Sequence, residues 1–92
     1  MIPFEWVEEA TRRLAPFITI TPITYDEDLN LFLKWENHQL TGSFKLRGAM
    51  NMVLSLQGWE LKRVLVNCSA CNHGQGVAYA ARIVKASCTV FA

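Results

Sequence analysis

Apolar residues recur at steps of three and four along three stretches of the chain, which is the spacing of an amphipathic helix. The first helix is predicted within residues 1–17, because Pro3 suits the first helical position and Pro16 cannot continue a helix. The second is predicted from about Phe44 to Leu56, and the third from Gly74 to Val84. On the first helix, glutamates precede arginines by four residues and are expected to pair with them: Glu8 with Arg12 and Glu9 with Arg13.

Short segments between and after these helices are rich in β-branched residues or alternate apolar with polar ones, and each predicts a strand. The acidic stretch Asp26-Glu27-Asp28 separates the first two strands as a solvated turn. The third strand, a small-residue loop and the third helix form half of a βαβ unit, so an α/β fold is expected. The predicted strands are Thr19–Tyr25, Leu31–Glu36, Arg63–Cys68 and Ser87–Phe91.

Lys45 has an unusual position in the second predicted helix. Ser43 is a good N-cap and Gly58 suits the C-terminal stop, which puts Lys45 in the first turn. There the positive end of the helix dipole disfavours a cation by roughly 0.3–1 kcal/mol, and Arg47 adds a second positive charge nearby. Both effects favour a neutral amine, which can act as a nucleophile toward a carbonyl group. A solvated lysine at a helix end is the simpler alternative.

Composition and charge exclude several classes of protein. The chain has 92 residues, of which 51% are hydrophobic and 18% charged, as expected of a small globular domain. A net charge of +1 with scattered Lys and Arg offers no basic surface for nucleic acid or an anionic membrane. The N-terminus lacks the cationic start of a signal peptide, and no apolar run is long enough to span a membrane. The odd number of cysteines, 3, fits reduced thiols, so a cytoplasmic location is expected.

Two blocks of sequence resemble motifs of one enzyme family. The block SFKLRGA at residues 43–49 closely resembles the cofactor-lysine motif of the threonine dehydratase and serine racemase family, the pyridoxal-phosphate enzymes of fold type II. The block SACNHGQGVA at residues 69–78 resembles the asparagine loop of that family, at about the expected distance downstream. The resemblance covers essentially the whole chain. It implies parallel-sheet βαβ units, with an N-terminal helix in residues 1–17 and the start of the cofactor-binding catalytic domain in residues 18–92.

The resemblance implies roles for individual residues. Lys45 would hold pyridoxal 5'-phosphate through its amine and move the α-proton of the substrate, and Phe44 would lie against the cofactor ring. Asn72 would hydrogen-bond the ring hydroxyl, and with Ser69 and His73 it would bind the substrate carboxylate. The implied substrate is a small amino acid, L-threonine or L-serine, and β-elimination from threonine gives 2-oxobutanoate and ammonia. The full-length enzyme is expected to be a homo-oligomer.

Some positions depart from the family pattern. Cys71 stands where the family has glycine, in a tight loop close to the ligand, so crowding or a costly positive φ is expected there. Lys85-Ala86-Ser87 replaces a turn in which the family usually places glycine. Racemases of the family carry a serine where this chain has Ala70, and alanine cannot donate a proton, so the complete enzyme is expected to eliminate and not to racemise appreciably.

The family's glycine-rich phosphate cup and the group that faces the pyridine nitrogen lie downstream of the residues present here. The chain stops at Ala92, directly after a predicted strand, and is therefore interpreted as the truncated amino-terminal part of the catalytic domain. We expect these 92 residues alone not to catalyse. A non-catalytic remnant of the family is an open alternative.

The spacing of the cysteines suggests a function of a different class. Cys68 and Cys71 form a C-x-x-C motif on a strand-to-helix turn, as expected of a redox dithiol. With His73 and Cys88 the same residues could be a zinc cluster, but the spacing matches no common zinc pattern. No metal site is assigned, and neither redox cycling nor stoichiometric zinc binding is expected. Structural roles are expected for two further polar residues, His38 and, in an ion pair, Arg47.

Overall fold

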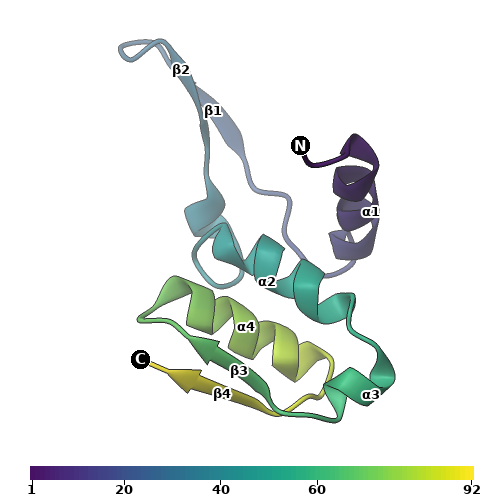
Figure 1. The fold of residues 1–92 in the computed structure, drawn as a ribbon. Coiled ribbons are helices and arrows are strands. Elements are labelled where there is room, and N and C mark those ends of the chain that lie inside the picture. Colours follow the sequence, from purple (N-terminus) through teal and green to yellow (C-terminus); the bar gives the residue numbers. More distant parts are fainter.

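The computed structural model describes all residues from 1 to 92. Figure 1 shows its helices and its two sheets of two strands each. None of the α-helices combines the length and the apolar composition that crossing a membrane requires. The helices are α1 (Phe4–Leu14), α2 (Lys45–Leu54), α3 (Gly58–Leu61) and α4 (Asn72–Ile83), with a 3-10 helix η1 (Glu36–His38); the strands are β1 (Ile23–Asp26), β2 (Leu31–Lys34), β3 (Leu65–Cys68) and β4 (Cys88–Phe91).

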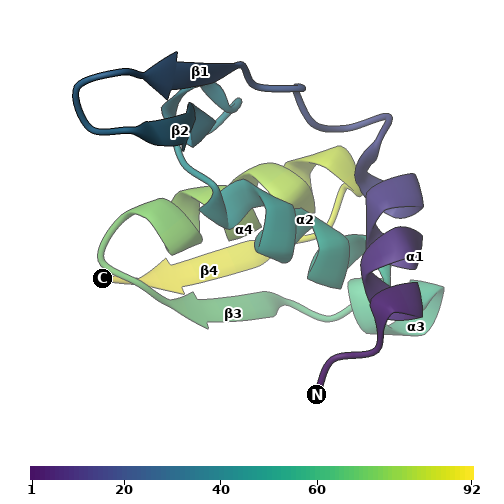
Figure 2. The ribbon, with the colours of Figure 1, turned by 90° about the horizontal axis from the view of Figure 1, so that it is seen from above.

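The C-terminal half of the chain contains a complete βαβ unit. β3 and β4 pair in parallel, with Leu65 opposite Cys88 and Cys68 opposite Phe91. α4 runs along one face of this two-stranded sheet, and α2 packs along α4 (Figures 1 and 2). Helices and parallel strands therefore alternate as predicted, which confirms the expected α/β fold with a parallel sheet.

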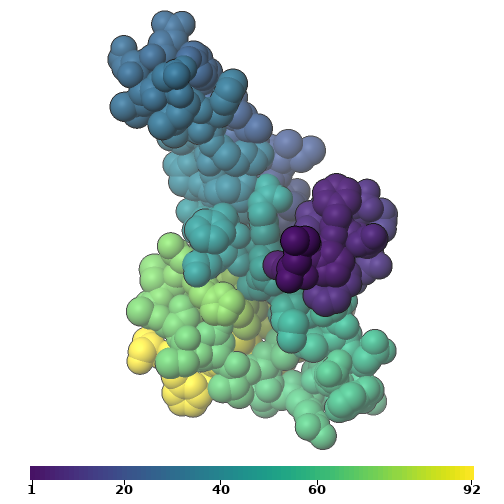
Figure 3. All heavy atoms as spheres, turned by 45° about the horizontal axis from the view of Figure 1, so that its top comes forward, coloured from purple at the N-terminus to yellow at the C-terminus, as the bar shows by residue number.

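β1 and β2 form an antiparallel hairpin that projects from the rest of the molecule (Figures 1 and 3). Tyr25 lies opposite Phe32, and the centroids of their rings are 5.1 Å apart. The two strands and the turn between them were predicted, but β1 begins at Ile23 and not at Thr19. The reason is that Thr19 and Thr21 are held by hydrogen bonds with side chains and have no neighbouring strand to pair with.

The hydrophobic core is small and lies mainly between α2 and α4. Only 11 of the 92 residues are buried, so much apolar surface stays open. Val66 and Phe91, on the face of the parallel sheet that α4 does not cover, are 67% and 58% exposed. Parallel sheets in α/β proteins are normally covered on both faces, and this chain covers one. The buried apolar residues are Leu14, Leu46, Ala49, Met50, Val53, Ala80 and Ala81.

The ends of α2 differ from the prediction. The helix spans Lys45–Leu54, where the pattern predicted Phe44 to Leu56, and Gly58 does not act as its stop. Gly58 instead begins α3, because Gln57 and Glu60 form a reciprocal capping box that starts a new helix there. A glycine after a helix therefore marked a helix start in this chain.

The predicted ion pairs along α1 do not form. The one ion pair in the structure joins Arg47 to Glu36, and neither Glu8–Arg12 nor Glu9–Arg13 is paired. Arg13 instead donates a hydrogen bond to the Asn51 side chain of α2 at 2.7 Å. An exposed pair four residues apart on one helix is worth only about 0.2–0.5 kcal/mol, so a partly buried contact between helices can replace it.

Lys85 has a left-handed backbone at the end of α4. Its φ is 58°, which glycine adopts freely and other residues disfavour. The Ala86 N–H donates to the Ala81 carbonyl at 2.8 Å and the Lys85 N–H donates to the Arg82 carbonyl at 3.2 Å, which is the Schellman pattern of helix termination. The turn in which this chain lacks the family's glycine is therefore one that requires a positive φ.

Replacing this lysine should stabilise the chain. We expect Lys85→Gly to raise the free energy of unfolding by about 1 kcal/mol, because glycine removes the strain of a left-handed residue that has a Cβ. The measurement is the urea midpoint followed by circular dichroism. Ala86→Gly is the matched control, since Ala86 has no positive φ and glycine there should only loosen the chain. A midpoint for Lys85→Gly at or below that of the unmodified chain would contradict the assignment.

Candidate active site

α2 and α4 begin at the same end of the molecule, where β3 and β4 end (Figures 1 and 2). Gly76 of α4 is buried at the contact between the two helices. A Cβ built on Gly76 would lie 3.2 Å from the Ala49 Cβ and 3.3 Å from the Lys45 carbonyl oxygen. The missing side chain thus lets the first turn of α2 pack directly on α4. This contact brings Lys45 and the loop before α4 to one region of the molecule.

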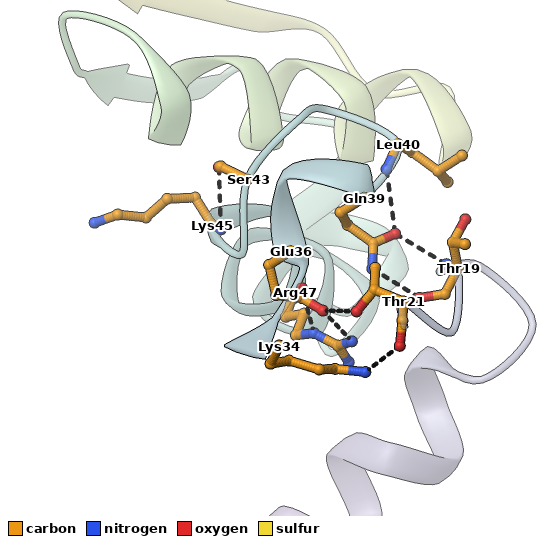
Figure 4. Close-up of polar contacts among 9 residues, drawn as sticks. All are labelled: Thr19, Thr21, Lys34, Glu36, Gln39, Leu40, Ser43, Lys45 and Arg47. Carbon is orange, nitrogen blue, oxygen red and sulfur yellow. Dashed lines mark hydrogen bonds and ion pairs between the residues drawn. The ribbon is translucent and has the colours of Figure 1, made fainter. Parts of the chain in front are cut away.

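Lys45 is the first residue of α2, and its side chain is exposed. Its Nζ lies 5.5 Å from the centroid of the Phe44 ring, which is 61% exposed. Figure 4 shows the lysine pointing away from the polar residues around Arg47. The Ser43 Oγ accepts a hydrogen bond from the Lys45 N–H at 3.3 Å, so Ser43 contributes to the helix start although Phe44 occupies the N-cap position.

The predicted asparagine loop is shorter than expected, because α4 begins at Asn72 and not at Gly74. Asn72 and His73 are exposed residues of the first helical turn, where backbone N–H groups have no carbonyl earlier in the helix to bond. Ser69 has a different environment: its Oγ accepts hydrogen bonds from the N–H groups of Cys71 at 3.3 Å and Gly74 at 3.0 Å. Ser69 therefore shapes the start of α4.

Cys71 does not have the positive φ that was expected of it. Its φ is −158° with a ψ of −99°, which lies outside the left-handed region, so no left-handed strain arises from replacing glycine. The thiol is exposed and donates a weak hydrogen bond to the Asn72 Oδ1 at 3.5 Å. Cys68 and Cys88 are also unpaired thiols, and nowhere do three potential metal-ligating side chains come together. The residues suggested as a zinc cluster are thus not gathered into one.

A groove that reaches the start of α4 was not predicted from the sequence. It has a volume of about 510 Å³, is lined mainly by apolar side chains of α2 and β3, and includes His73 and Asn67. Ser69 lines a second, smaller groove of about 330 Å³. Lys45, Phe44 and Asn72 line neither. The predicted site residues therefore lie at one end of the molecule but are not enclosed in a common cavity.

Arg47 makes the structural ion pair that was expected of it. Its Nε and Nη2 donate to the two carboxylate oxygens of Glu36, each at 2.8 Å. These hydrogen bonds lower the pKa of Glu36 from 4.5 to about 2, against the opposing effect of burial, and a hydrogen bond from Thr21 adds to the lowering. The pKa of Arg47 is raised by the same pair. No sequence pattern indicated Glu36 as the partner, since it lies 11 residues away in η1.

Comparison with known proteins identifies the class to which this chain belongs. Residues 11–92 match the family model described as pyridoxal-phosphate dependent enzyme. The chain is 43% identical over 96 residues to an L-threonine ammonia-lyase of Thermotoga maritima, covering 98% of this chain and 24% of that protein. It is 39% identical over 90 residues to a serine racemase of Dictyostelium discoideum, covering 91% of this chain and 28% of that protein.

Solved structures show the same relationship. The crystal structure of serine racemase from Dictyostelium discoideum matches with a TM-score of 0.90 and 37% identity, over 97% of this chain and 31% of that one. The crystal structure of a T.th. threonine deaminase matches with a TM-score of 0.85 and 36% identity, over 96% of this chain and 33% of that one. The chain thus belongs to the family of pyridoxal-phosphate-dependent enzymes and has the fold of the fold-type II members. It spans about a quarter to a third of the length of these relatives.

The residues around Lys45 fit one side of this cofactor. An aldehyde needs an accessible amine, and the Lys45 amine is exposed and makes no ion pair. An aromatic ring system can stack on an exposed side-chain ring, which Phe44 provides beside that amine. The hydroxyl of Thr41, in the loop that leads to Lys45, is buried without a hydrogen-bond partner in the chain. This loop can therefore still form a hydrogen bond with a bound group.

The close contact at Gly76 can be tested with two substitutions. We expect Gly76→Ala to lower the free energy of unfolding on the order of 1 kcal/mol, because pushing α2 away outweighs the better helix propensity of alanine. Gly48→Ala is the matched control on α2, where an added Cβ meets nothing within 4 Å. It should raise the free energy of unfolding by up to about 1 kcal/mol. If urea unfolding gives equal effects for the two changes, then α2 can move away from Gly76 without a cost in stability, and the contact is not a tight one.

The low pKa of Glu36 predicts a loss of stability in acid. A carboxyl group whose pKa is lower in the folded chain favours folding above its unfolded pKa, and this contribution disappears as the pH falls toward its folded pKa. With values of 4.5 and about 2, the loss between about pH 6 and about pH 3 is on the order of 2 kcal/mol. Urea unfolding at both pH values measures it. Glu36→Gln should show a drop smaller by that amount, and an equal drop would contradict the assignment.

Proposed function

We propose that this chain is the lysine-bearing, amino-terminal part of a dehydratase that converts L-threonine, or L-serine, to a 2-oxo acid and ammonia by β-elimination. The observation that supports the proposal is the packing of α2 on α4 at Gly76, because it holds the helical turn that begins with Lys45 against the helix that follows the Ser69–His73 segment. In this proposal, Lys45 supplies the amine for the cofactor and the start of α4 supplies the donors for a carboxylate. The similarity to an L-threonine ammonia-lyase supports the choice of substrate.

Each residue has a defined task in this proposal. When bound, pyridoxal phosphate supplies the electron sink that stabilises a carbanion at the substrate Cα. Lys45 would hold the cofactor through its amine and, once the substrate amine has displaced it, would accept the Cα proton of the amino acid, after which the β-hydroxyl leaves as water. Phe44 would cover one face of the cofactor ring, and the Asn72 amide would donate to the ring hydroxyl.

The substrate carboxylate is bound at the start of α4. Ser69, Asn72 and His73 lie within or next to its first turn, where free N–H groups and the positive end of the helix dipole attract an anion. The Ser69 Oγ already accepts hydrogen bonds from Cys71 and Gly74, so its own proton is available for donation to the carboxylate. Fixing the carboxylate orients the Cα–H bond toward the lysine.

Ala70 favours elimination over racemisation. Racemisation requires a proton donor on the face of the substrate opposite the lysine, and alanine has none. A racemase is the second candidate function, because a serine racemase is among the relatives of this chain. We further propose that the complete enzyme is a cytoplasmic homo-oligomer. We do not propose that the 92 residues alone catalyse the reaction, because one face of their parallel sheet and much of their apolar surface are uncovered.

The experiment is a chimera in which residues 1–92 replace the matching segment of the Thermotoga maritima L-threonine ammonia-lyase. We expect it to form 2-oxobutanoate and ammonia from L-threonine, and to lose activity by at least about a thousandfold in Lys45→Ala. From L-serine it should release ammonia far faster than it forms D-serine. Ala70→Ser, which restores a hydroxyl, should increase D-serine formation. D-serine formed by the unmodified chimera at a rate comparable with ammonia release would favour the racemase.

A further inference from the structure

The ion pair of Arg47 and Glu36 is part of a larger polar cluster that joins three segments of the chain (Figure 4). The Thr21 hydroxyl donates to the same Glu36 carboxylate, and the Lys34 Nζ donates to the Thr21 carbonyl at 2.6 Å. Thr21 is only 2% exposed, so its polar groups are satisfied inside the protein. The cluster thereby connects the segment after α1, the base of the hairpin and the first turn of α2.

Gln39 anchors the same segment from the other side. Its Nε2 donates to the Thr19 carbonyl at 2.8 Å, and its Oε1 accepts hydrogen bonds from the N–H groups of Thr19 at 2.9 Å and Leu40 at 3.2 Å. The residue is only 4% exposed. Gln39 is therefore fixed at the point where the chain leaves η1 and enters the loop before α2.

The loop of residues 40–44 is thus anchored at both ends. Gln39 fixes its start, and the bidentate pair of Arg47 with Glu36 fixes the helical turn into which it runs. Within the loop, Gly42 turns the chain with a φ of 76° and donates its N–H to the Gln39 carbonyl at 2.8 Å. Lys45 follows this loop directly, so the position of its backbone depends on both anchors.

Arg47 lies two residues after Lys45, where the helix dipole disfavours a cation. If the Arg47–Glu36 ion pair served only to stabilise α2, its arginine would be better placed toward the end of the helix, where the dipole favours a cation. We infer that Glu36 and Arg47 are positioning residues for Lys45: by fixing the first turn of α2 against the base of the hairpin, they present the lysine amine at a defined place. They act through the backbone, because the Lys45 side chain points away from them (Figure 4). The inference rests on the cofactor-holding function proposed for Lys45.

The test measures the reactivity of Lys45 and the order of its loop in the 92-residue chain. Pyridoxal phosphate is added, the adducts are trapped with borohydride, and mass spectrometry gives the labelling of Lys45 relative to Lys62. Hydrogen exchange of the amides of residues 40–46 is followed in parallel, without cofactor. We expect Glu36→Gln to lower the labelling ratio about fivefold and to speed exchange in the loop. Glu36→Asp, which keeps the charge, should retain most of the ratio.

Arg13→Gln is the matched control, because it removes another guanidinium contact to α2, at Asn51, and leaves the cluster intact. It should lower the urea midpoint without changing the labelling ratio or the exchange of residues 40–46. An unchanged ratio and unchanged exchange in Glu36→Gln, or an equal loss in Arg13→Gln, would overturn the inference. If Glu36→Gln does not fold, Thr21→Val, which removes one hydrogen bond to Glu36, takes its place in both measurements. No preference for Lys45 in the unmodified chain would count against the proposed function, whereas the exchange data test the positioning independently.

Discussion

The close packing of α2 on α4 is the contact on which the rest of the structure depends. Gly76 has no side chain, so the backbone of Lys45 and Leu46 can lie against α4 at distances that would be too short if this residue had a Cβ. The buried residues Leu46, Met50 and Ala80 gather along this same contact. Because protein interiors are close-packed, the interaction that forms the core also fixes how closely the first turn of α2 approaches α4.

Gly74 plays the corresponding part on the other side of α4. A Cβ there would lie 2.9 Å from a methyl group of Val90 in β4 and 3.5 Å from the Ser69 Cβ. The two glycines therefore let α4 approach α2 on one side and the parallel sheet on the other. Residues two positions apart in a helix point to different sides, so both close contacts are made within one helical turn. The same turn carries polar groups of the site, which is why small and polar residues occur together there.

The ion pair of Arg47 with Glu36 holds α2 on its opposite side. Burying the Glu36 carboxylate is unfavourable by itself, and the bidentate guanidinium of Arg47 offsets that cost, as the low pKa of Glu36 indicates. The same pair neutralises a cation in the first turn of α2, where the helix dipole disfavours it. Lys45 is left as the uncompensated cation of that turn. The hairpin, which buries little apolar surface, is connected to the body of the protein through this polar cluster.

The sequence by itself determined the order of helices and strands, the α/β fold and the family, because hydrophobic periodicity and two ordered motifs are local features. It also located the turn of Lys85 as one that favours glycine. Tertiary structure decided what depends on segments distant in the chain: the partner of Arg47 lies 11 residues away, and that of Arg13 lies 38 residues away. The start of α3 at Gly58 was likewise set by neighbouring hydrogen bonds, and the negative φ of Cys71 by the entry into α4; residue identity alone does not specify either.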